Sequence, residues 1–390
     1  MITEWCLALA AVTALSQAGR PPVFSIDVWK EIVGPARLTA APPPHVYAQP
    51  GRLGPLLELQ ADGGLVPVKT KAQWEQKRRH LRQDFTWFFG RFPTKRAPLD
   101  LKVTAEEDMG PYVRKTIEFT AEPGDRDYGF LLVPKGLTGK APGVVCPHQT
   151  NEVGCLEPIG AGGDPQYAYA DELARRGYVT IACDALCFGK RHAADANSYG
   201  DSVPFYEKHP HWTIAGKYAF DVSRQVDALQ SLPEVDPARI GCIGHSLGGH
   251  TTIYAMAYDP RIKVGVSNCG FTSFRADQAA RGLWAYYNAT SIFPILYQLD
   301  SEEAIARVPI DYHEMLALVA PRPFLIIAPT RDGGFAHEGV VETFEALKPL
   351  YAFLGAPDAI RMLSPDCEHA FPPEAREKAY AFLEEHLKGR

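Results

Sequence analysis

The chain has 390 residues, 46% of them hydrophobic, which is ample for a large hydrophobic core. Its formal net charge is −6, and acidic and basic residues are scattered along the chain, so we expect neither a nucleic-acid-binding nor an anionic-membrane-binding surface. No apolar run reaches the roughly 18 residues of a membrane-spanning helix, so no membrane span is expected.

Residues 1–98 are predicted to form an N-terminal helical extension. Residues 5–15 are largely apolar, and residues 16–18 (Ser-Gln-Ala) resemble a signal-peptide cleavage site. Residues 1–4, however, carry an acid and no lysine or arginine, whereas a signal peptide begins with positive charge. We therefore expect a structural helix here and a cytoplasmic location. The alternative is a secreted or periplasmic protein, if residues 1–18 are a signal peptide.

The extension also contains an amphipathic pattern that predicts a helix over residues 72–89, and from residue 99 onward strand-like and helix-like segments alternate. The first three strand-like segments alternate polar and apolar residues, which predicts an antiparallel edge. The others are buried apolar runs, typical of parallel strands covered on both faces. Together they predict one mostly parallel α/β sheet flanked by helices. The nine segments are residues 101–104, 113–120, 128–133, 144–146, 178–182, 240–243, 262–267, 324–328 and 360–363.

The most informative segment is residues 240–250, in which an apolar strand ends at Gly244-His245-Ser246-Leu247-Gly248 and a helix begins near Leu247. This context is typical of a nucleophile elbow, a tight turn that exposes a serine at the top of a sheet. Ser246 is therefore the candidate nucleophile. The N–H of Leu247, at the positive end of the helix, is a candidate donor to an oxyanion.

A second oxyanion donor is expected from the loop after the strand at 144–146, and by position the best candidate is Thr150. Many esterases have a His-Gly pair in this loop. The present chain has His148-Gln149, which lacks the backbone freedom of glycine.

A serine nucleophile needs an imidazole to accept its proton and a carboxylate to orient that imidazole. In this architecture the chain order is serine, acid, histidine. Asp332 follows the buried strand at 324–328, and His369 lies in the loop after the last strand, so we assign the acid to Asp332 and the base to His369. Asp366 and Glu368 are rival acids, but they are too close in sequence to reach the ring of His369 while it faces Ser246.

Residues 271–320 form a long connection between two core strands and contain Trp284, Tyr286, Tyr287, Phe293 and Tyr297. Connections of this length are usually functional, so we expect a cap that lines a substrate pocket within a catalytic domain of residues 99–390. The alternative is a further packed helical layer.

The eight cysteines suit buried free thiols in a reducing compartment, because four of them lie in or beside separate core strands: Cys146, Cys183, Cys242 and Cys269. The glycines at 160–163 do not follow a strand in a βαβ unit, Cys183 and Cys187 have no second ligand pair, and no His-Glu-x-x-His occurs. We therefore expect no cofactor and no metal, and the expected partner is a small-molecule ester substrate.

Five segments together resemble the α/β-hydrolases of the dienelactone-hydrolase and acetyl-xylan-esterase-like group: residues 148–150, 244–249, 268–274, 331–332 and 367–371. The resemblance covers roughly residues 100–390. It implies an α/β-hydrolase fold with a helical cap insertion and an N-terminal extension. It also implies a serine carboxylesterase that hydrolyses small polar esters, such as acetylated carbohydrates, through an acyl-enzyme. Dienelactone hydrolases use a cysteine nucleophile, whereas Ser246 indicates ordinary ester hydrolysis.

Three alternatives stay open at this point. A serine peptidase of the prolyl-oligopeptidase type usually carries a propeller domain, for which residues 1–98 are too few. A non-catalytic binding protein of this fold typically lacks a triad member, whereas here all three positions are filled. Glucuronoyl esterases share the general layout, but they carry a positively charged residue after the serine, where this chain has Leu247.

Overall fold

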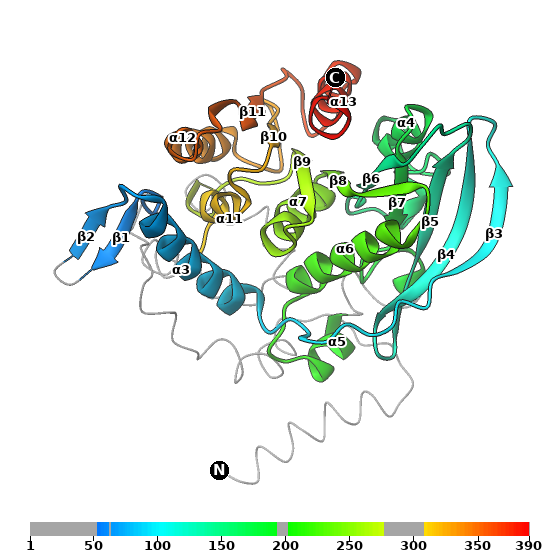
Figure 1. The fold of residues 1–390 in the computed structure, drawn as a ribbon, viewed down its shortest axis with the longest axis horizontal. Helices are drawn as coiled ribbons and strands as arrows, with labels where there is room; N and C mark the ends of the chain where they lie inside the picture. The colour runs from blue at the N-terminus through cyan, green and yellow to red at the C-terminus, as the bar shows by residue number, and fades with distance from the viewer. Residues whose placement is uncertain (1–52, 62–63, 193–201, 277–307, 390) are drawn as a thin grey trace, which may run out of the picture.

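The computed structural model describes residues 53–61, 64–192, 202–276 and 308–389 and contains a nine-stranded sheet (Figure 1). The strand order is β11-β10-β9-β8-β6-β7-β5-β4-β3, in which β11 to β7 run parallel and β5, β4 and β3 form an antiparallel edge. Every predicted strand is present, which confirms the predicted α/β fold. The bounds are β3 (Lys102–Asp108), β4 (Tyr112–Glu122), β5 (Asp125–Pro134), β6 (Ala141–Val145), β7 (Val179–Cys183), β8 (Val235–His245), β9 (Ile262–Asn268), β10 (Phe324–Ile327) and β11 (Ile360–Leu363).

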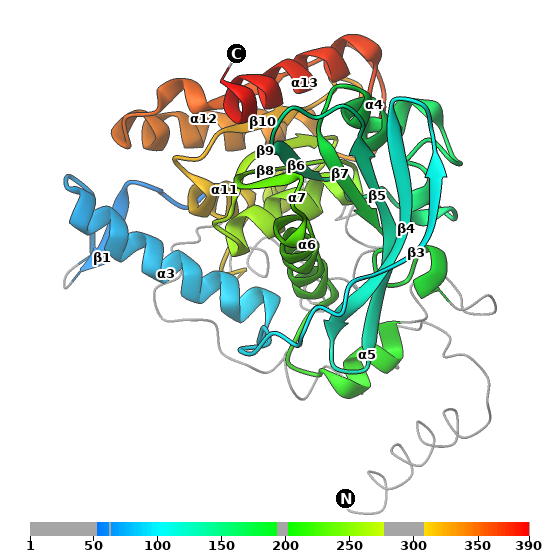
Figure 2. The same ribbon diagram turned by 45° about the vertical axis from the view of Figure 1, so that its right-hand side comes forward.

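Helices cover both faces of the sheet (Figure 2). On one face lie α6, α7, α11 and α12, with α3 outside α6 and α11, and on the other lie α4 and α13. Each layer encloses its own apolar core, as expected of parallel strands that are apolar on both faces. The bounds are α3 (Lys71–Phe89), α4 (Tyr169–Arg175), α5 (Ser202–Lys208), α6 (Ile214–Ser231), α7 (Leu247–Tyr258), α11 (Tyr312–Val319), α12 (His337–Phe353) and α13 (Pro373–Lys388).

A buried group of charges ties α6 to the β4–β5 turn and to the loop after β7; we call it the Arg191–Lys217 cluster. Arg191 pairs with Asp125 and Asp221, both at 2.8 Å, and Lys217 pairs with the same two carboxylates at 2.5 and 2.6 Å. The side chains of Arg191 and Lys217 are only 3% and 1% exposed. Buried charges that are not paired are strongly unfavourable. Because these charges pair with one another, they can lie buried where α6 meets the β4–β5 turn and the loop after β7.

The N-terminal region contains α3, as predicted, and a hairpin that was not predicted, formed by β1 (Glu58–Ala61) and β2 (Gly64–Pro67). Helix α3 begins with a capping box between Thr70 and Gln73, and its buried face places Trp74 and Phe88 in the core. The expected helix at 5–15 and the signal-peptide alternative fall outside the described residues. Among the helices that the structure describes, none is long and apolar enough to cross a membrane.

Only the two ends of the expected cap segment are described. Helix α11, near its C-terminal end, packs against α7, α3 and α12 as part of the helical layer, and all its residues are buried. Residues 277–307, which include the five aromatic residues noted above, lie outside the described residues, so the cap stays a prediction.

Candidate active site

The turn between β8 and α7 holds Ser246 in a backbone conformation that few residues other than glycine adopt, with φ 52° and ψ −117°. Its N–H donates to the Asn268 carbonyl at 2.9 Å. The two elbow glycines are required by close backbone contacts. A Cβ at Gly244 would lie 2.3 Å from the Gly248 backbone, and one at Gly248 would lie 2.1 Å from the Pro147 carbonyl oxygen. The predicted elbow is therefore present, and it leaves the Ser246 side chain partly exposed.

His369 and Asp332 meet beside this turn. The ring Nδ1 of His369 lies 2.9 and 3.0 Å from the two carboxylate oxygens of Asp332, and because a carboxylate only accepts, Nδ1 carries the proton. Burial alone would raise the pKa of Asp332, but hydrogen bonds from His369 and from the N–H groups of Gly334 and Phe335 hold that pKa below its usual value. Asp332 is therefore a fixed, charged partner for the ring.

Three further residues position the loop of His369. The ring of His245 stacks on Tyr167 at 4.2 Å and tilts against His369 at 4.7 Å between ring centroids. The hydroxyl of Tyr167 donates to the His369 carbonyl at 3.2 Å. The amide Nδ2 of Asn268 donates to Nδ1 of His245 at 2.6 Å and to the Ala370 carbonyl at 3.1 Å. The elbow is thus tied directly to the backbone of the last loop.

Two neighbouring imidazoles stay neutral. Burial, together with the positive charge that His369 gains on protonation, lowers the pKa of His245 well below its usual value and that of His250 to about 3. His250 lies four residues into the elbow helix and contacts the ring of Phe335. Because both rings are uncharged near neutral pH, His369 is the histidine beside Ser246 that remains suited to proton transfer.

The loop after β6 lies against the elbow, and Glu157 holds it in place. The buried Glu157 carboxylate accepts from the side-chain amides of Gln149 at 3.0 Å and Asn151 at 2.8 Å. His148 is buried, with Nε2 accepting from the Ala185 N–H at 3.0 Å. The expected oxyanion donor of this loop, Thr150, is exposed.

Comparisons with known proteins match this chain to esterases and to a hydrolase. The family model "Glucuronyl esterase, fungi" matches residues 166–355. The Bacillus subtilis protein YtaP, named as a hydrolase, is 26% identical over 318 residues, which cover 80% of this chain and all of YtaP. The solved glucuronoyl esterase from Solibacter usitatus is 19% identical with a TM-score of 0.69, covering 87% of this chain and 99% of that chain. Acetyl xylan esterase 1 from Thermoanaerobacterium is 16% identical with a TM-score of 0.52, covering 79% of this chain and 92% of that chain.

The chain has an α/β-hydrolase fold, and the proteins that it matches include glucuronoyl and acetyl xylan esterases. It spans only 45–56% of the length of the 4-O-methyl-glucuronoyl methylesterases of Wolfiporia cocos, Phanerochaete carnosa and Schizophyllum commune, at 21–25% identity.

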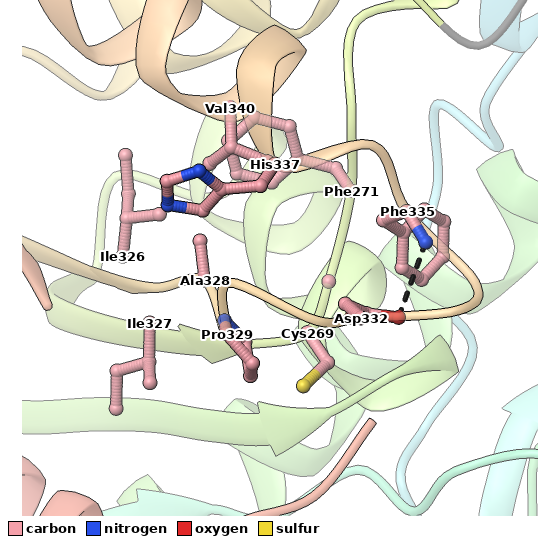
Figure 3. Close-up of a pocket in the computed structure, with 11 residues that line it drawn as sticks. Cys269, Phe271, Ile326, Ile327, Ala328, Pro329, Asp332, Phe335, His337 and Val340 are labelled. Carbon is pink, nitrogen blue, oxygen red and sulfur yellow. Dashed lines mark hydrogen bonds between the residues drawn. The ribbon is translucent and has the colours of Figure 1, made fainter. Parts of the chain in front are cut away.

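The structure also places the rival candidate residues. Asp366 is exposed and pairs with Arg331 at 3.3 Å, and Glu368 is also exposed. His337 lines the same small cavity as Asp332 but points away from it, toward Ser364, whose Oγ lies 3.0 Å from Nε2 (Figure 3). The structure therefore brings Asp332, and not Asp366 or Glu368, to the ring of His369.

Ser246 and the oxyanion donors are less tightly assembled. In the described part of the chain, no hydrogen bond joins the Ser246 hydroxyl to His369, and none joins it to Thr150. Leu247 is the first residue of α7, as expected. Ser246, His369 and Asp332 therefore lie at one edge of the sheet, but only His369 and Asp332 are hydrogen-bonded to each other. Hydrogen bonds between catalytic residues are often long before substrate binds.

Sequence reasoning assigned no specific role to Tyr167, Asn268 or Glu157. Asn268 could have been found, because it is a polar residue that directly follows a predicted apolar strand. The carboxyl ends of parallel strands meet at one edge of the sheet, where the site lies. Tyr167 and Glu157 lie in irregular segments, for which the sequence offered no periodic pattern.

The same edge contains a group that has the donor atoms of a metal site. The Cys269 Sγ, an Asp332 oxygen and a His369 ring nitrogen all lie within 4.8 Å of one another.

Proposed function

We propose that Ser246, His369 and Asp332 form a catalytic triad that hydrolyses small esters of carbohydrates through an acyl-enzyme. The observation that supports this most strongly is the bond between Nδ1 of His369 and the buried Asp332 carboxylate, next to a serine held at φ 52°. A strained serine and an oriented imidazole on one sheet edge are the two parts that serine hydrolysis requires.

In this mechanism the free Nε2 of His369 accepts the Ser246 hydroxyl proton while the serine oxygen attacks the ester carbonyl. Asp332 keeps the proton on Nδ1 and stabilises the imidazolium that forms. His369 then gives its proton to the leaving alcohol, and a water repeats the cycle to free the acid. The N–H of Leu247 is the proposed first oxyanion donor and that of Thr150 the proposed second.

The carbohydrate class of substrate comes from the relatives, which include acetyl xylan and glucuronoyl esterases. Acetylated carbohydrate is the leading candidate, because Leu247 lacks the positive charge that glucuronoyl esterases place after the serine. The family match over residues 166–355 favours the second candidate, an ester of a glucuronic acid. The two differ in which side of the ester is the sugar: the alcohol in the first case, the acid in the second.

One assay series separates these candidates. Initial rates are measured with acetylated xylan, with benzyl glucuronate and with p-nitrophenyl esters from acetate to octanoate. We expect acetylated xylan and p-nitrophenyl acetate to be cleaved, with kcat/KM falling as the acyl chain lengthens. Cleavage of benzyl glucuronate alone would move the function to the second candidate. Rates that rise steadily to octanoate would contradict both, since each buried methylene adds ~0.8 kcal/mol only where a deep acyl pocket exists.

A further inference from the structure

Cys269 stands directly beside the proposed acid and base, although ester hydrolysis has no use for a thiol there. It follows the last residue of β9, and its N–H donates to the Ile327 carbonyl at 2.9 Å, which places it level with the end of β10. The loop that carries Asp332 begins at that strand end, and Figure 3 shows Cys269 and Asp332 on adjacent segments. The thiol also donates to the Ala370 carbonyl at 3.5 Å, next to His369. Three segments far apart in sequence thus bring one sulfur, one oxygen and one nitrogen together.

The backbone at Cys269 makes this placement specific. Its φ is 47°, in the left-handed region where glycine is favoured, yet a residue with a side chain occupies the position. The side chain is 2% exposed and directed inward, so the strained turn presents the sulfur to Asp332 and not to solvent. Backbone strain of this kind persists only where the surrounding structure fixes it.

We propose that Cys269, Asp332 and His369 form an inhibitory binding site for Zn²⁺ or another thiophilic divalent cation. Thiolate, carboxylate and imidazole are the three protein ligands of zinc, and Nδ1 of His369 already lies 2.9 Å from its carboxylate partner. The Cys269 Sγ, an Asp332 oxygen and a His369 ring nitrogen lie within 4.8 Å of one another. With bonds of about 2.0 to 2.3 Å, a tetrahedral zinc would hold these atoms about 3.3 to 3.5 Å apart, which side-chain rotation supplies. One thiolate and one carboxylate neutralise the dication, so the occupied site carries no net charge.

Binding of Zn²⁺ moves two protons. The cation displaces the proton of the Cys269 thiol, and this proton leaves for solvent. The cation also binds Nδ1 of His369, and the ring then carries its proton on Nε2. One proton is therefore released for each cation bound. The Cys269 thiol donates a hydrogen bond to the Ala370 carbonyl when no metal is bound, and because the cation displaces the thiol proton, cation binding becomes tighter as the pH rises.

The cation would inhibit the enzyme because it changes the tautomer of His369. With the metal on Nδ1, Nε2 becomes an N–H donor and can no longer accept the Ser246 proton. The His369 side chain is 31% exposed, which gives the cation a route to the two buried ligands. The binding site itself does not depend on the proposed function, whereas the inhibition rests on His369 acting as the base.

The test uses the full chain, freed of metal, in buffer without thiols or chelators. Zn²⁺ is titrated by calorimetry, Co²⁺ is titrated by absorption in the thiolate charge-transfer region, and esterase activity is followed in parallel. We expect one cation per chain, one proton released, inhibition that a chelator reverses, and sulfur-to-cobalt absorption. Cys269→Ser should weaken Zn²⁺ binding at least about tenfold and abolish that absorption. Inhibition is expressed relative to the metal-free activity of each variant.

Cys367→Ser is the matched control, because that thiol lies two residues before His369 in the same loop but outside the three-atom group. It should bind Zn²⁺ as the parent does. Equal Zn²⁺ affinity in Cys269→Ser and the parent would overturn the site, and so would inhibition that a thiol reductant reverses and a chelator does not. Cys269-dependent binding without loss of activity would support the site and instead contradict the role of His369 in the proposed function.

Discussion

Two buried polar clusters lie at the same edge of the sheet, and they are built differently. In the Arg191–Lys217 cluster each cation meets three carboxylates, and both cation side chains are at most 3% exposed. At the candidate active site His369 meets one carboxylate, keeps one ring nitrogen open, and is 31% exposed beside the strained Ser246. A cluster in which every charge is paired holds the fold together. A cluster in which one ring nitrogen of a histidine stays free to accept a proton beside a nucleophile can catalyse a reaction.

The largest effect should come from removing the charge of Asp332. Asp332→Asn keeps the shape of the site but no longer stabilises the imidazolium or fixes its tautomer, so kcat should fall by about 10⁴-fold. The matched control is Asp366→Asn, which removes an exposed carboxylate of the neighbouring loop and should change kcat less than about twofold. Steady-state kinetics on p-nitrophenyl acetate measures both. Equal losses in the two variants would mean that Asp332 is not the acid.

The next largest effect should appear in stability. Lys217→Met leaves Asp125 and Asp221 with one cation fewer in a buried setting, so the free energy of unfolding should fall by about 3 to 5 kcal/mol. Arg361→Met breaks an exposed pair with Glu385 and should lower it by less than about 1 kcal/mol. Urea unfolding gives both values. A Lys217→Met protein of full stability but little activity would contradict the structural role assigned to the Arg191–Lys217 cluster.

A smaller effect concerns the stability of the fold at acidic pH. Burial lowers the pKa of His250 to about 3 from an ordinary value of 6.5, with His369, the backbone of Gly270 and the hydroxyl of Tyr312 as its polar neighbours. The unfolded chain therefore binds a proton below pH 6.5 that the folded chain does not. This contribution to stability is complete above pH 6.5 and is lost by ~1.4 kcal/mol per pH unit as the pH falls toward 3.

The variant His250→Gln should flatten that dependence. Its unfolding free energy, measured in urea at pH 7 and at pH 5, should fall by roughly 2 kcal/mol less between the two than that of the parent. An identical acid loss in both proteins would mean that the His250 ring titrates normally in the fold.

The smallest effect should follow from Tyr167→Phe, which deletes the hydroxyl that donates to the His369 carbonyl but keeps the ring stacked on His245. One lost hydrogen bond of about 1 kcal/mol should lower kcat roughly fivefold with KM unchanged. Because the substitution acts through the position of His369, the pH profile of kcat should also shift. A change in KM alone would indicate that Tyr167 contacts substrate instead.

The strands and the elbow could be predicted because their signals are local. Apolar runs between turn residues locate β6 to β11, and the strained turn needs only Gly244, Ser246 and Gly248. The chain order of acid and base then selected Asp332 and His369, and the structure brings these two together. Which of the histidines remain neutral could not be read from sequence, since it depends on burial.

What the sequence did not reveal depends on register and on irregular segments. The β1–β2 hairpin has short strands with largely polar or exposed residues, so no periodic signal marks it. The contact of Asn268 with the Ala370 backbone, and the approach of Cys269 to Asp332, exist only because β9 and β10 pair with Asn268 opposite Ile327. A shift of one residue in that pairing would reverse which side chains reach the site.

The most direct test of the central claim is covalent labelling of Ser246. The full chain is treated with an organofluorophosphonate, digested and mapped by mass spectrometry, and Ser246→Ala is treated alongside. We expect one adduct, on Ser246, complete loss of esterase activity in the labelled protein, and a loss of at least ~10³-fold in the unlabelled Ser246→Ala protein at unchanged Tm. An adduct on another residue, or a Ser246→Ala protein that is folded and still fully active, would contradict the assignment of this turn as the catalytic centre.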